Sequence, residues 1–416
     1  MRATRAPLAA DGAVVIAGAG LGGLRCAEAL RNLGFSGRVT MIGDEPGLPY
    51  DRPPLTKQLL SGQWDASRIE LVSAAKLDEL GIQLRGGVTA TSLDVEAREV
   101  ALVDGTTVRG DAVVVATGAQ PRWLPGTEGL PGVHVVRTLA QGEALRDALA
   151  ALPEGARVVV VGAGFIGAEV ASTAAAAGHH VVLLEGLDVP LSPIVGPMVG
   201  EWLTDLHRDA GVEVRTAVAI AAVHPAADGP GATVELVGGS RVDADLVVLG
   251  IGVTPTTSWL DGSALTIDNG VVTDASLFAA DGVVAVGDLA RFEWHHGGFT
   301  EQVRIEHWEV TAQMASAAAH SLLAGRDDAP RVSLVPYFWS DQHGRKIQML
   351  GRPAGTDDVT VLAGTRAESK FTVAYHRGGR LTGVLGLASP RNVMVCRSLV
   401  DAAAPVGDAV ALFAGT

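Results

Sequence analysis

Short, uniformly apolar runs recur along the chain, and the segments between them have the apolar spacing of helices. Runs of this length without polar alternation are typical of strands buried on both faces, as in a parallel sheet. Helical spacing in residues 24–33 and 168–177 places a helix after a strand twice. The buried strands predicted in this way are residues 13–17, 38–42, 111–116, 157–161, 180–184, 244–249 and 283–286. The alternation predicts an α/β fold with two Rossmann-like dinucleotide-binding domains.

The last part of the sequence has a different pattern. Its β-like runs are separated by turn residues, as in hairpins, and no glycine-rich nucleotide loop occurs among them. We predict a linker at 323–330, a helix over 389–399, and strands at 346–350, 358–363, 371–376 and 381–387. The predicted domains are a first dinucleotide-binding domain (1–121 and 252–330), a second one (122–251), and a C-terminal α+β domain (331–416).

A glycine-rich loop, GAGLGG at residues 18–23, joins the first predicted strand to the first helix. In this context Gly18 makes the tight turn, Gly20 lets a ligand approach the backbone, and Gly23 allows the helix to pack closely on the strand. Bare N–H groups and the positive end of the helix dipole then form a site for a pyrophosphate. A glycine-rich turn without a ligand is the alternative. The predicted binding residues here are Gly18, Gly20, Leu21, Gly22 and Gly23.

The same arrangement occurs a second time. GAGFIG at residues 162–167 follows a strand and opens an alanine-rich helix, and Glu185 stands at the end of the next strand, 23 residues after Gly162. A carboxylate at this spacing accepts hydrogen bonds from an adenosine 2′-hydroxyl and repels a 2′-phosphate, which favours NAD over NADP. The predicted binding residues are Gly162, Gly164, Phe165, Ile166, Gly167 and Glu185. Two dinucleotide folds in one chain indicate two cofactors.

Further candidates stand at strand ends near the first loop. Asp44, with Glu45 as the second choice, follows the strand 38–42 and is placed to bind a ribose, although an acidic surface loop is equally consistent. Arg52 and Lys57 lie in a proline-rich loop and bring two cations together beside the nucleotide. Asp288 stands two residues after the strand 283–286, where it could accept hydrogen bonds from the hydroxyls of a polyol. A turn or helix-cap role is also typical of an aspartate at such a position.

Composition narrows the functional classes. The chain has 416 residues, 48% hydrophobic and 19% charged, which fits two or three globular domains. Its net charge of −14 argues against a general polyanion binder such as a nucleic-acid protein. Cys26 and Cys396 form no CxxC pair, so we expect neither a disulfide framework nor a metal site. Without a recognisable signal segment or a membrane-length apolar run, the sequence predicts a cytoplasmic protein without a membrane span.

Seven stretches together carry a family resemblance. They are residues 18–23 (GAGLGG), 50–57 (YDRPPLTK), 116–118 (ATG), 162–169 (GAGFIGAE), 286–288 (VGD), 304–308 (RIEHW) and 338–342 (FWSDQ). The chain thereby resembles the FAD-dependent, NADH-linked ferredoxin reductases of cytochrome P450 and aromatic-ring dioxygenase systems, of the putidaredoxin reductase and biphenyl dioxygenase ferredoxin reductase type. The glycine loops are common to flavoproteins with two dinucleotide domains. The proline-rich loop and the WSDQ segment are the specific signals.

This resemblance implies roles for individual residues. The first glycine loop would hold FAD together with Asp44, Arg52, Lys57, Thr117 and Asp288. The second loop would hold NADH together with Glu185 and with Gly252, which lies in a glycine-rich turn further on. Further cofactor-binding positions are Val88, Ala116, Gly118, Arg122 and Gly287. Trp308 would line the flavin, Glu169 would lie near the nicotinamide, and both are predicted catalytic residues together with Lys57. The implied reaction is hydride transfer from NADH to FAD, followed by single-electron transfers to a [2Fe–2S] ferredoxin that feeds a P450 or a Rieske-type oxygenase.

The partner-docking surface is predicted less directly. We expect Arg291, Arg304, Arg345 and Lys346 to form a positive patch around Trp339 that receives an acidic ferredoxin, although each cation taken singly is more typical of a solvated surface. A lysine that some members carry after the WSDQ segment is replaced here by Gln348. Members of the family often carry an arginine a few residues after the carboxylate that binds the adenosine ribose, but no arginine follows Glu185 at this distance. Whether the protein is a monomer or a weak homodimer stays open.

Three alternatives compete with this interpretation. A rubredoxin or another one-electron carrier could be the acceptor, since no stretch identifies the partner. A disulfide or peroxide reductase shares the two-nucleotide plan but needs a redox-active cysteine beside the flavin. A flavin-bearing binding protein resembling apoptosis-inducing factor is disfavoured by the acidic composition.

Overall fold

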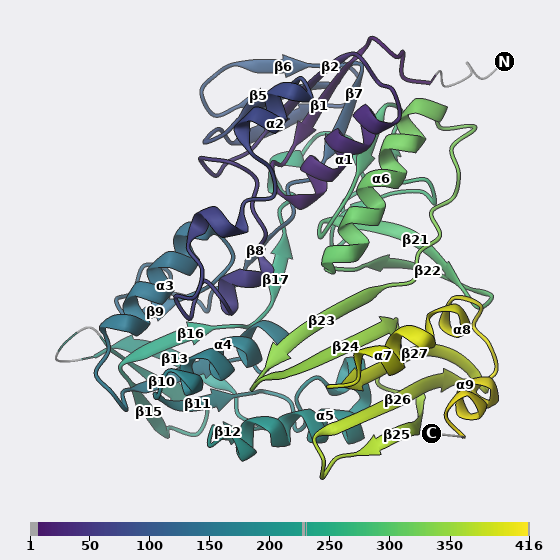
Figure 1. Cartoon of the computed structure of the whole chain (residues 1–416). Helices are drawn as coiled ribbons and strands as arrows, with labels where there is room; N and C mark the ends of the chain where they lie inside the picture. The colour runs from purple at the N-terminus through teal and green to yellow at the C-terminus, as the bar shows by residue number, and fades with distance from the viewer. Residues whose placement is uncertain (1–6, 227–228, 230, 415–416) are drawn as a thin grey trace. The chain divides into compact units, whose positions relative to one another are not determined.

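The structure is a computed structural model that describes residues 7–226, 229 and 231–414 (Figure 1). Residues 1–6, which belong to the stretch searched for a signal segment, lie outside the described part. The chain divides into two compact units. The first comprises the residues up to Asp51, Glu70–Gln120 and Thr254–Pro336, and the second comprises Arg52–Ile69, Pro121–Val253 and the residues from Tyr337 on. The comparisons reported below confirm the predicted α/β class.

The first unit is built on a six-stranded sheet with the order β19-β20-β7-β1-β2-β3. Its central strands β1, β2, β7 and β20 run parallel, in register from Ala13 opposite Arg38 onward. The sheet strands are β1 (Ala13–Ala17), β2 (Arg38–Ile42), β3 (Ile82–Arg85), β7 (Ala112–Val115), β19 (Phe278–Ala280) and β20 (Val283–Ala285). Val14, Ile16 and Val114 are completely or almost completely buried, as uniform apolar runs predict.

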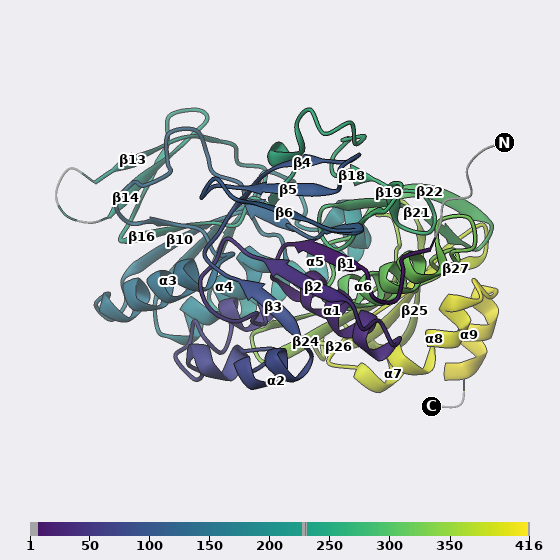
Figure 2. The same ribbon diagram turned by 90° about the horizontal axis from the view of Figure 1, so that it is seen from above.

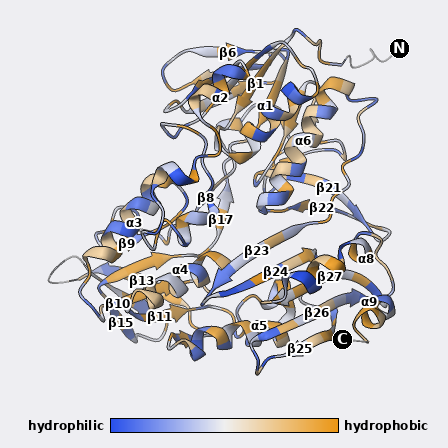
Figure 3. Cartoon of the chain, viewed as in Figure 1, coloured by the Kyte–Doolittle hydropathy of each residue, from blue (hydrophilic) through white to orange (hydrophobic). Residues whose placement is uncertain are grey.

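Helices and smaller sheets complete the first unit. Helix α1 (Leu21–Asn32) packs against the alanine-rich helix α6 (Trp308–Ala324), which Figure 3 shows in mostly hydrophobic colours. Figure 2 shows the antiparallel strands β4, β5 and β6 side by side. The remaining elements are α2 (Ala74–Glu79), β4 (Ala90–Asp94), β5 (Glu99–Leu102), β6 (Thr107–Arg109), η3 (Ser258–Leu260), β18 (Val271–Val272), β21 (Ala290–His296) and β22 (Phe299–Arg304). The short strands β8 (Ala119–Pro121) and β17 (Val253–Pro255) carry the chain between units.

The second unit contains a parallel sheet with the order β12-β11-β10-β16-β9 and an antiparallel sheet with the order β23-β24-β27-β26-β25. The parallel sheet has helices α3 (Leu139–Ala151), α4 (Phe165–Ala176) and α5 (Ser192–Asp209) in its connections. Its strands are β9 (Val133–His134), β10 (Arg157–Val161), β11 (His180–Leu184), β12 (Glu213–Arg215) and β16 (Leu246–Leu249), and β13 (Ile220–Pro225), β14 (Ala232–Leu236) and β15 (Arg241–Ala244) form a small separate sheet.

The C-terminal sheet packs one face against α5. Tyr375, which has no exposed surface, donates a hydrogen bond from its hydroxyl to the Val195 carbonyl on α5 (2.9 Å). The elements are β23 (Tyr337–Gln342), β24 (Arg345–Gly351), β25 (Asp358–Thr365), β26 (Lys370–Arg377), β27 (Arg380–Leu387), α7 (Pro390–Val395), α8 (Arg397–Asp401) and α9 (Val406–Phe413), and the loop 52–69 adds η1 (Pro53–Thr56) and η2 (Ala66–Ile69). No helix in the described part of the chain is long and apolar enough to cross a membrane.

Several predicted bounds are wrong in detail. Helices α1 and α4 begin at Leu21 and Phe165, three residues earlier than predicted, because the last glycine of each loop lies inside the first helical turn. The helix predicted over 389–399 is interrupted at Cys396 into α7 and α8. The hairpin of β21 and β22 was not predicted, although Gly297 and Gly298 make its turn.

A buried carboxylate stabilises the C-terminal sheet. Asp357 is 8% exposed and accepts hydrogen bonds from the Ala354 N–H (3.0 Å), the Thr382 hydroxyl (2.7 Å) and the Arg377 Nε (2.8 Å). Burial alone would raise the pKa of Asp357, but these bonds and the Arg377 charge outweigh it and hold the pKa below its ordinary value. The ionised form is therefore favoured by folding.

We expect Asp357→Asn to lower the free energy of unfolding at pH 7 by about 1–2 kcal/mol, because an amide cannot accept all of these bonds. A depressed pKa stabilises the fold above the unfolded-state pKa of about 3.9, and this contribution disappears as the pH falls through the folded-state pKa. The difference between wild type and variant in urea unfolding should therefore shrink in acid. A difference that stays constant down to pH 2 would contradict this assignment.

Candidate active site

The first glycine loop has the geometry of a phosphate cradle. Gly18 has φ +120°, and a Cβ placed on it would lie 2.1 Å from the Ala116 carbonyl oxygen. A Cβ on Gly23 would lie 1.9 Å from the Gly18 carbonyl oxygen, whereas one on Gly20 would meet nothing within 4 Å. Gly20 caps α1 without a side-chain hydrogen bond, and the first turn has no acidic residue. The first N–H groups of a helix have no acceptor within the helix, and at this end they fit a dinucleotide pyrophosphate.

The two carboxylates predicted to bind a ribose, Asp44 and Glu45, differ in their surroundings. Glu45 accepts a hydrogen bond from the Tyr50 hydroxyl (2.6 Å), while Asp44 is exposed at the end of β2. This difference favours Asp44 for a ribose. The Val88 N–H donates to the Gly43 carbonyl (2.9 Å), so Val88 also lies at this strand end.

Two further strand ends of the same sheet face the loop. Ala116 and Gly118 flank Thr117, whose hydroxyl donates to the Thr256 carbonyl (2.8 Å) and accepts from Trp259 Nε1 (3.2 Å). Because these bonds occupy the hydroxyl, we infer that Thr117 would contact FAD through its backbone. The Thr256 and Trp259 contacts were not predicted, since they join positions more than 130 residues away in the sequence.

The end of β20 lies close to the first turns of α1 and α6. A Cβ on Gly287, which has φ +80°, would lie 3.3 Å from the Thr311 methyl group, and so would a Cβ on Gly22. Asp288 follows, and its carbonyl accepts a hydrogen bond from Arg304 (3.0 Å). Trp308 begins α6, and its Nε1 donates to Asp51 Oδ1 (2.7 Å). Asp51, which sequence reasoning did not single out, therefore orients the predicted flavin-lining aromatic ring.

The second glycine loop repeats the first. A Cβ on Gly162 (φ +97°) would lie 2.5 Å from the Gly250 carbonyl oxygen, one on Gly167 would lie 1.9 Å from the Gly162 carbonyl oxygen, and one on Gly164 would meet nothing within 4 Å. Gly164 caps α4 without a side-chain hydrogen bond. The Glu185 carboxylate accepts from the Ala163 N–H (2.8 Å) and the Leu187 N–H (2.9 Å), which fixes it at the rim of this cradle.

Other predicted NADH contacts surround the same strand ends. Ile166 is 48% exposed in the first turn of α4, whereas Phe165 packs edge-on against Phe338 with ring centroids 4.5 Å apart. Gly252 has φ +92°, and its carbonyl accepts from the Arg122 N–H (3.0 Å). Arg122 also donates through Nε to the Val253 carbonyl (3.0 Å). These contacts give Arg122 a structural anchor on this loop.

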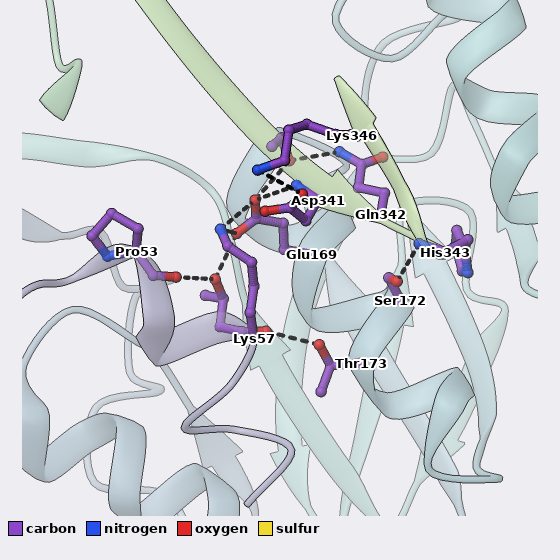
Figure 4. A network of polar contacts seen from close by, with 11 residues as sticks. Pro53, Lys57, Glu169, Ser172, Thr173, Asp341, Gln342, His343 and Lys346 are labelled. Atoms are coloured by element: carbon purple, nitrogen blue, oxygen red, sulfur yellow. Dashed lines mark hydrogen bonds and ion pairs between the residues drawn. The ribbon is translucent and has the colours of Figure 1, made fainter. Parts of the chain in front are cut away.

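A buried ion pair joins Lys57 to Glu169 (Figure 4). Lys57 follows η1 and Glu169 lies on α4, and the ammonium nitrogen is 2.7 Å from each carboxylate oxygen. The Glu169 side chain is 3% exposed and that of Lys57 is 11% exposed. Arg52, the other predicted cation of this loop, donates to the Arg137 carbonyl (2.8 Å) instead. The structure thus brings two predicted catalytic residues into direct contact.

Three more donors surround the Glu169 carboxylate. The Thr56 hydroxyl donates to Oε2 (2.6 Å), and the Ser340 hydroxyl (2.7 Å) and the Asp341 N–H (3.1 Å) donate to Oε1. Together with the Lys57 ammonium, these donors give both buried oxygens of Glu169 charge-assisted hydrogen bonds. Such a group orients its neighbours and stabilises positive charge. Thr56 and Ser340 were missed as site residues, although they stand inside the PPLTK and WSDQ stretches that carry the family resemblance.

The predicted docking residues have acidic neighbours. Arg291 and Arg304 are cross-strand partners on β21 and β22 of the first unit, and they form ion pairs with Asp268 and Glu306. In the second unit, Lys346 lies 3.3 Å from Asp341, and Trp339 stacks on Tyr337 with centroids 6.2 Å apart. Arg345 is exposed at the start of β24. The carboxylates offset part of the positive charge that the sequence suggests.

The two cysteines are both buried and unpaired. Burial raises the pKa of the Cys26 thiol to about 12 and that of the Cys396 thiol to about 11. A reactive cysteine is instead exposed and has a lowered pKa. This chain therefore lacks the cysteine that a disulfide or peroxide reductase needs.

Comparison with known proteins identifies the class. The sequence model of the pyridine nucleotide-disulphide oxidoreductase family matches residues 12–315 of this chain. The family model of the reductase C-terminal domain matches residues 337–412. The chain belongs to the pyridine nucleotide-disulphide oxidoreductase family and is an FAD-dependent oxidoreductase.

Individual relatives are similar over nearly their whole length. Rhodocoxin reductase of Rhodococcus erythropolis is 35% identical over 94% of this chain and 90% of its own. The ferredoxin–NAD(+) reductase component of the anthranilate 1,2-dioxygenase system of Burkholderia cepacia is 38% identical over 94% of both chains. The crystal structure of the covalent putidaredoxin reductase–putidaredoxin complex matches with a TM-score of 0.89 and 31% identity, covering 98% of this chain and 100% of that one. These findings confirm the resemblance inferred from the sequence.

Proposed function

We propose that this protein is an NADH-dependent ferredoxin reductase that passes electrons from NADH through FAD to a [2Fe–2S] ferredoxin, which in turn serves a P450 or a Rieske-type oxygenase. The observation that carries the proposal is the pair of glycine cradles with nearly identical geometry in one chain. Two bound dinucleotides are what hydride transfer from one cofactor to another requires. The names of the similar proteins support a ferredoxin as the acceptor.

The residues have separate tasks in this proposal. The first cradle, Asp44, the backbone of Thr117, and Asp288 hold FAD, while the second cradle and Glu185 hold NADH. When bound, FAD supplies the ability to accept a hydride and to release electrons one at a time. The chain itself supplies binding and fixed charge, because the Lys57–Glu169 pair is held rigid by Thr56 and Ser340. No residue of the pair needs to exchange a proton during the hydride step.

The function is tested with the purified holoprotein. We expect a bound flavin spectrum, rapid anaerobic bleaching by NADH, and bleaching by NADPH at least about tenfold slower, since Glu185 repels a 2′-phosphate. Cytochrome c reduction should then depend on added [2Fe–2S] ferredoxin. A colourless protein would overturn the proposal, equal rates with NADPH would overturn the role of Glu185, and ferredoxin-independent turnover or turnover with rubredoxin alone would change the acceptor.

The docking surface is tested by charge reversal. Arg304 is unsuitable because its side chain also supports the Asp288 carbonyl, so Arg345→Glu and Lys346→Glu are the informative variants. At low salt each should raise the KM for an acidic ferredoxin by about fivefold, through lost electrostatic attraction. NADH–ferricyanide activity should not change. Lys370→Glu, an exposed charge on β26, is the matched control. An unchanged KM in both docking variants would remove these residues from the interface.

A further inference from the structure

A buried chain of hydrogen bonds leads from Glu169 through β23 to α5, all within the second unit. Ser340 Oγ lies 2.7 Å from Glu169 Oε1, and Gln342 Nε2 lies 3.1 Å from Ser340 Oγ. His207 Nε2 lies 3.1 Å from Gln342 Oε1, and His343 Nε2 lies 2.9 Å from His207 Nδ1. Figure 4 shows the Glu169 end of this chain, with Gln342 reaching toward Glu169 from β23.

These polar side chains are buried where the fold would favour apolar ones. Ser340 is 0% exposed, Gln342 1% and His207 4%. Burying three polar groups is unfavourable unless each one finds a partner, so the chain of bonds is needed to keep them there.

The outer end of the chain is fixed by the backbone. His343 has φ +48°, a left-handed conformation that favours Gly or Asn in a tight hairpin turn. Its N–H donates to the Ser172 hydroxyl on α4 (2.7 Å), and its ring makes an edge contact with His207 at 4.7 Å between centroids. A histidine in a strained turn conformation, held at both its backbone and its ring, is consistent with a function for that ring.

The charge of Glu169 sets the direction of the first two bonds. An ionised carboxylate only accepts, so the Ser340 hydroxyl must donate its one hydrogen to Oε1. Ser340 Oγ can then only accept from Gln342, which requires the amide NH₂ of Gln342 on that side. The opposite amide orientation would place two acceptors together beside Ser340.

The same reasoning continues to the histidines. With its NH₂ toward Ser340, Gln342 presents its carbonyl to His207, so His207 carries its proton on Nε2. His207 Nδ1 is then an acceptor, and His343 must donate from Nε2. Because its Nδ1 accepts a hydrogen bond, the His207 ring is neutral in this arrangement. Burial, together with the neighbouring His343, lowers the pKa of His207 to about 4 despite the opposing Gln342 bond, and burial lowers that of His343.

We propose that His207, His343 and Gln342 are positioning residues for hydride transfer: their one-way chain of donors orients the Ser340 hydroxyl and thereby holds the Glu169 carboxylate in place against Lys57. The chain is not a proton-conducting path, because the neutral amide of Gln342 interrupts it and does not pass protons on. Its role rests on the proposed function, in which the Lys57–Glu169 pair supplies fixed charge for hydride transfer.

Kinetics of the holoprotein test the positioning role. Gln342→Met keeps the side-chain length but removes both hydrogen bonds. We expect the rate of flavin reduction at saturating NADH to fall about tenfold with an unchanged NADH Kd, since small displacements of a fixed charge affect the reaction more than binding. Tyr375→Phe, which removes another buried hydrogen bond to α5, is the matched control and should stay within about twofold of wild type.

The pathway of the effect is tested in a Glu169→Gln background. If Gln342 acts through the carboxylate, adding Gln342→Met there should slow flavin reduction by less than about twofold more. An undiminished tenfold effect, or an equal loss in Tyr375→Phe, would reduce Gln342 to a general structural role and overturn the proposal.

Histidine tautomers give a readout that needs no turnover. In ¹⁵N-histidine-labelled oxidised holoprotein, with the signals assigned through His207→Asn and His343→Asn, both rings should be Nε2–H tautomers at pH 7. A His207 ring protonated at Nδ1 would overturn the proposal even if Gln342→Met fails to fold. Because this measurement uses no NADH or ferredoxin, its result does not depend on whether the proposed reductase function is correct.

Discussion

Gly167→Ala is expected to destabilise the protein by about 2–4 kcal/mol, whereas Gly164→Ala, three residues earlier in the same loop, leaves stability within about 0.5 kcal/mol. The reason is the space that each new methyl group meets. At Gly167 a Cβ would lie 1.9 Å from the Gly162 carbonyl oxygen, so α4 must move away from β10. At Gly164 the Cβ would point into open space.

The order reverses for ligand binding. The methyl group of Gly164→Ala would occupy the place where a pyrophosphate approaches the bare N–H groups of α4, so NADH affinity should fall about tenfold or more. Urea unfolding of the holoproteins measures the first effect, and anaerobic titration with NADH measures the second. Equal stability of the two variants would show that the loop can shift to accommodate a methyl group at Gly167 at little cost in free energy. Unchanged NADH affinity in Gly164→Ala would place the nucleotide elsewhere.

Lys57→Met is expected to lower the free energy of unfolding by about 3 kcal/mol, because it leaves the Glu169 carboxylate buried without its cation. The remaining donors are the neutral groups of Thr56, Ser340 and Asp341, which do not replace a full charge. In the same variant, flavin reduction at saturating NADH should slow by about tenfold or more, since the pair supplies the fixed charge of the site.

A double variant separates these effects. Adding Glu169→Gln to Lys57→Met removes the stranded charge and should restore most of the lost stability, but not the rate. Lys76→Met removes an exposed pair with Glu79, whose side chains are 48% and 66% exposed, and should change stability by less than about 0.5 kcal/mol. A double variant as unstable as Lys57→Met would show that packing of the lysine stem, and not its charge, stabilises this region.

The sequence alone was sufficient for the parts of the molecule that rest on local pattern. The strands Arg38–Ile42, Arg157–Val161 and His180–Leu184 were predicted to the residue, because buried parallel strands are uniform apolar runs. The glycines of both loops stand at a strand–helix junction in the structure, as their motifs predict.

The parts that depend on distant contacts could not be predicted. Lys57 and Glu169 were each singled out, but their contact spans 112 residues of sequence and appears only in the folded chain. The bonds that occupy the Thr117 hydroxyl and the chain of donors behind Glu169 have the same long-range origin. Of the acids paired with the predicted docking cations, only Asp268 is distant in sequence from its partner, Arg291. Glu306 and Asp341 stand within five residues of Arg304 and Lys346, so the sequence already contained these two neighbours.

The way the chain passes between the units determines the order in which they can be completed during synthesis. All strands of the sheet that carries the second cradle lie between Val133 and Leu249, whereas the sheet of the first cradle needs β20, whose Val283 pairs with Val113. A ribosome therefore releases every strand of the second cradle's sheet before the first sheet can close. Until β20 is synthesised, the four earlier strands β3, β2, β1 and β7 leave the β7 edge unpaired. A stalled ribosome or a truncated product would keep this edge exposed and prone to aggregation.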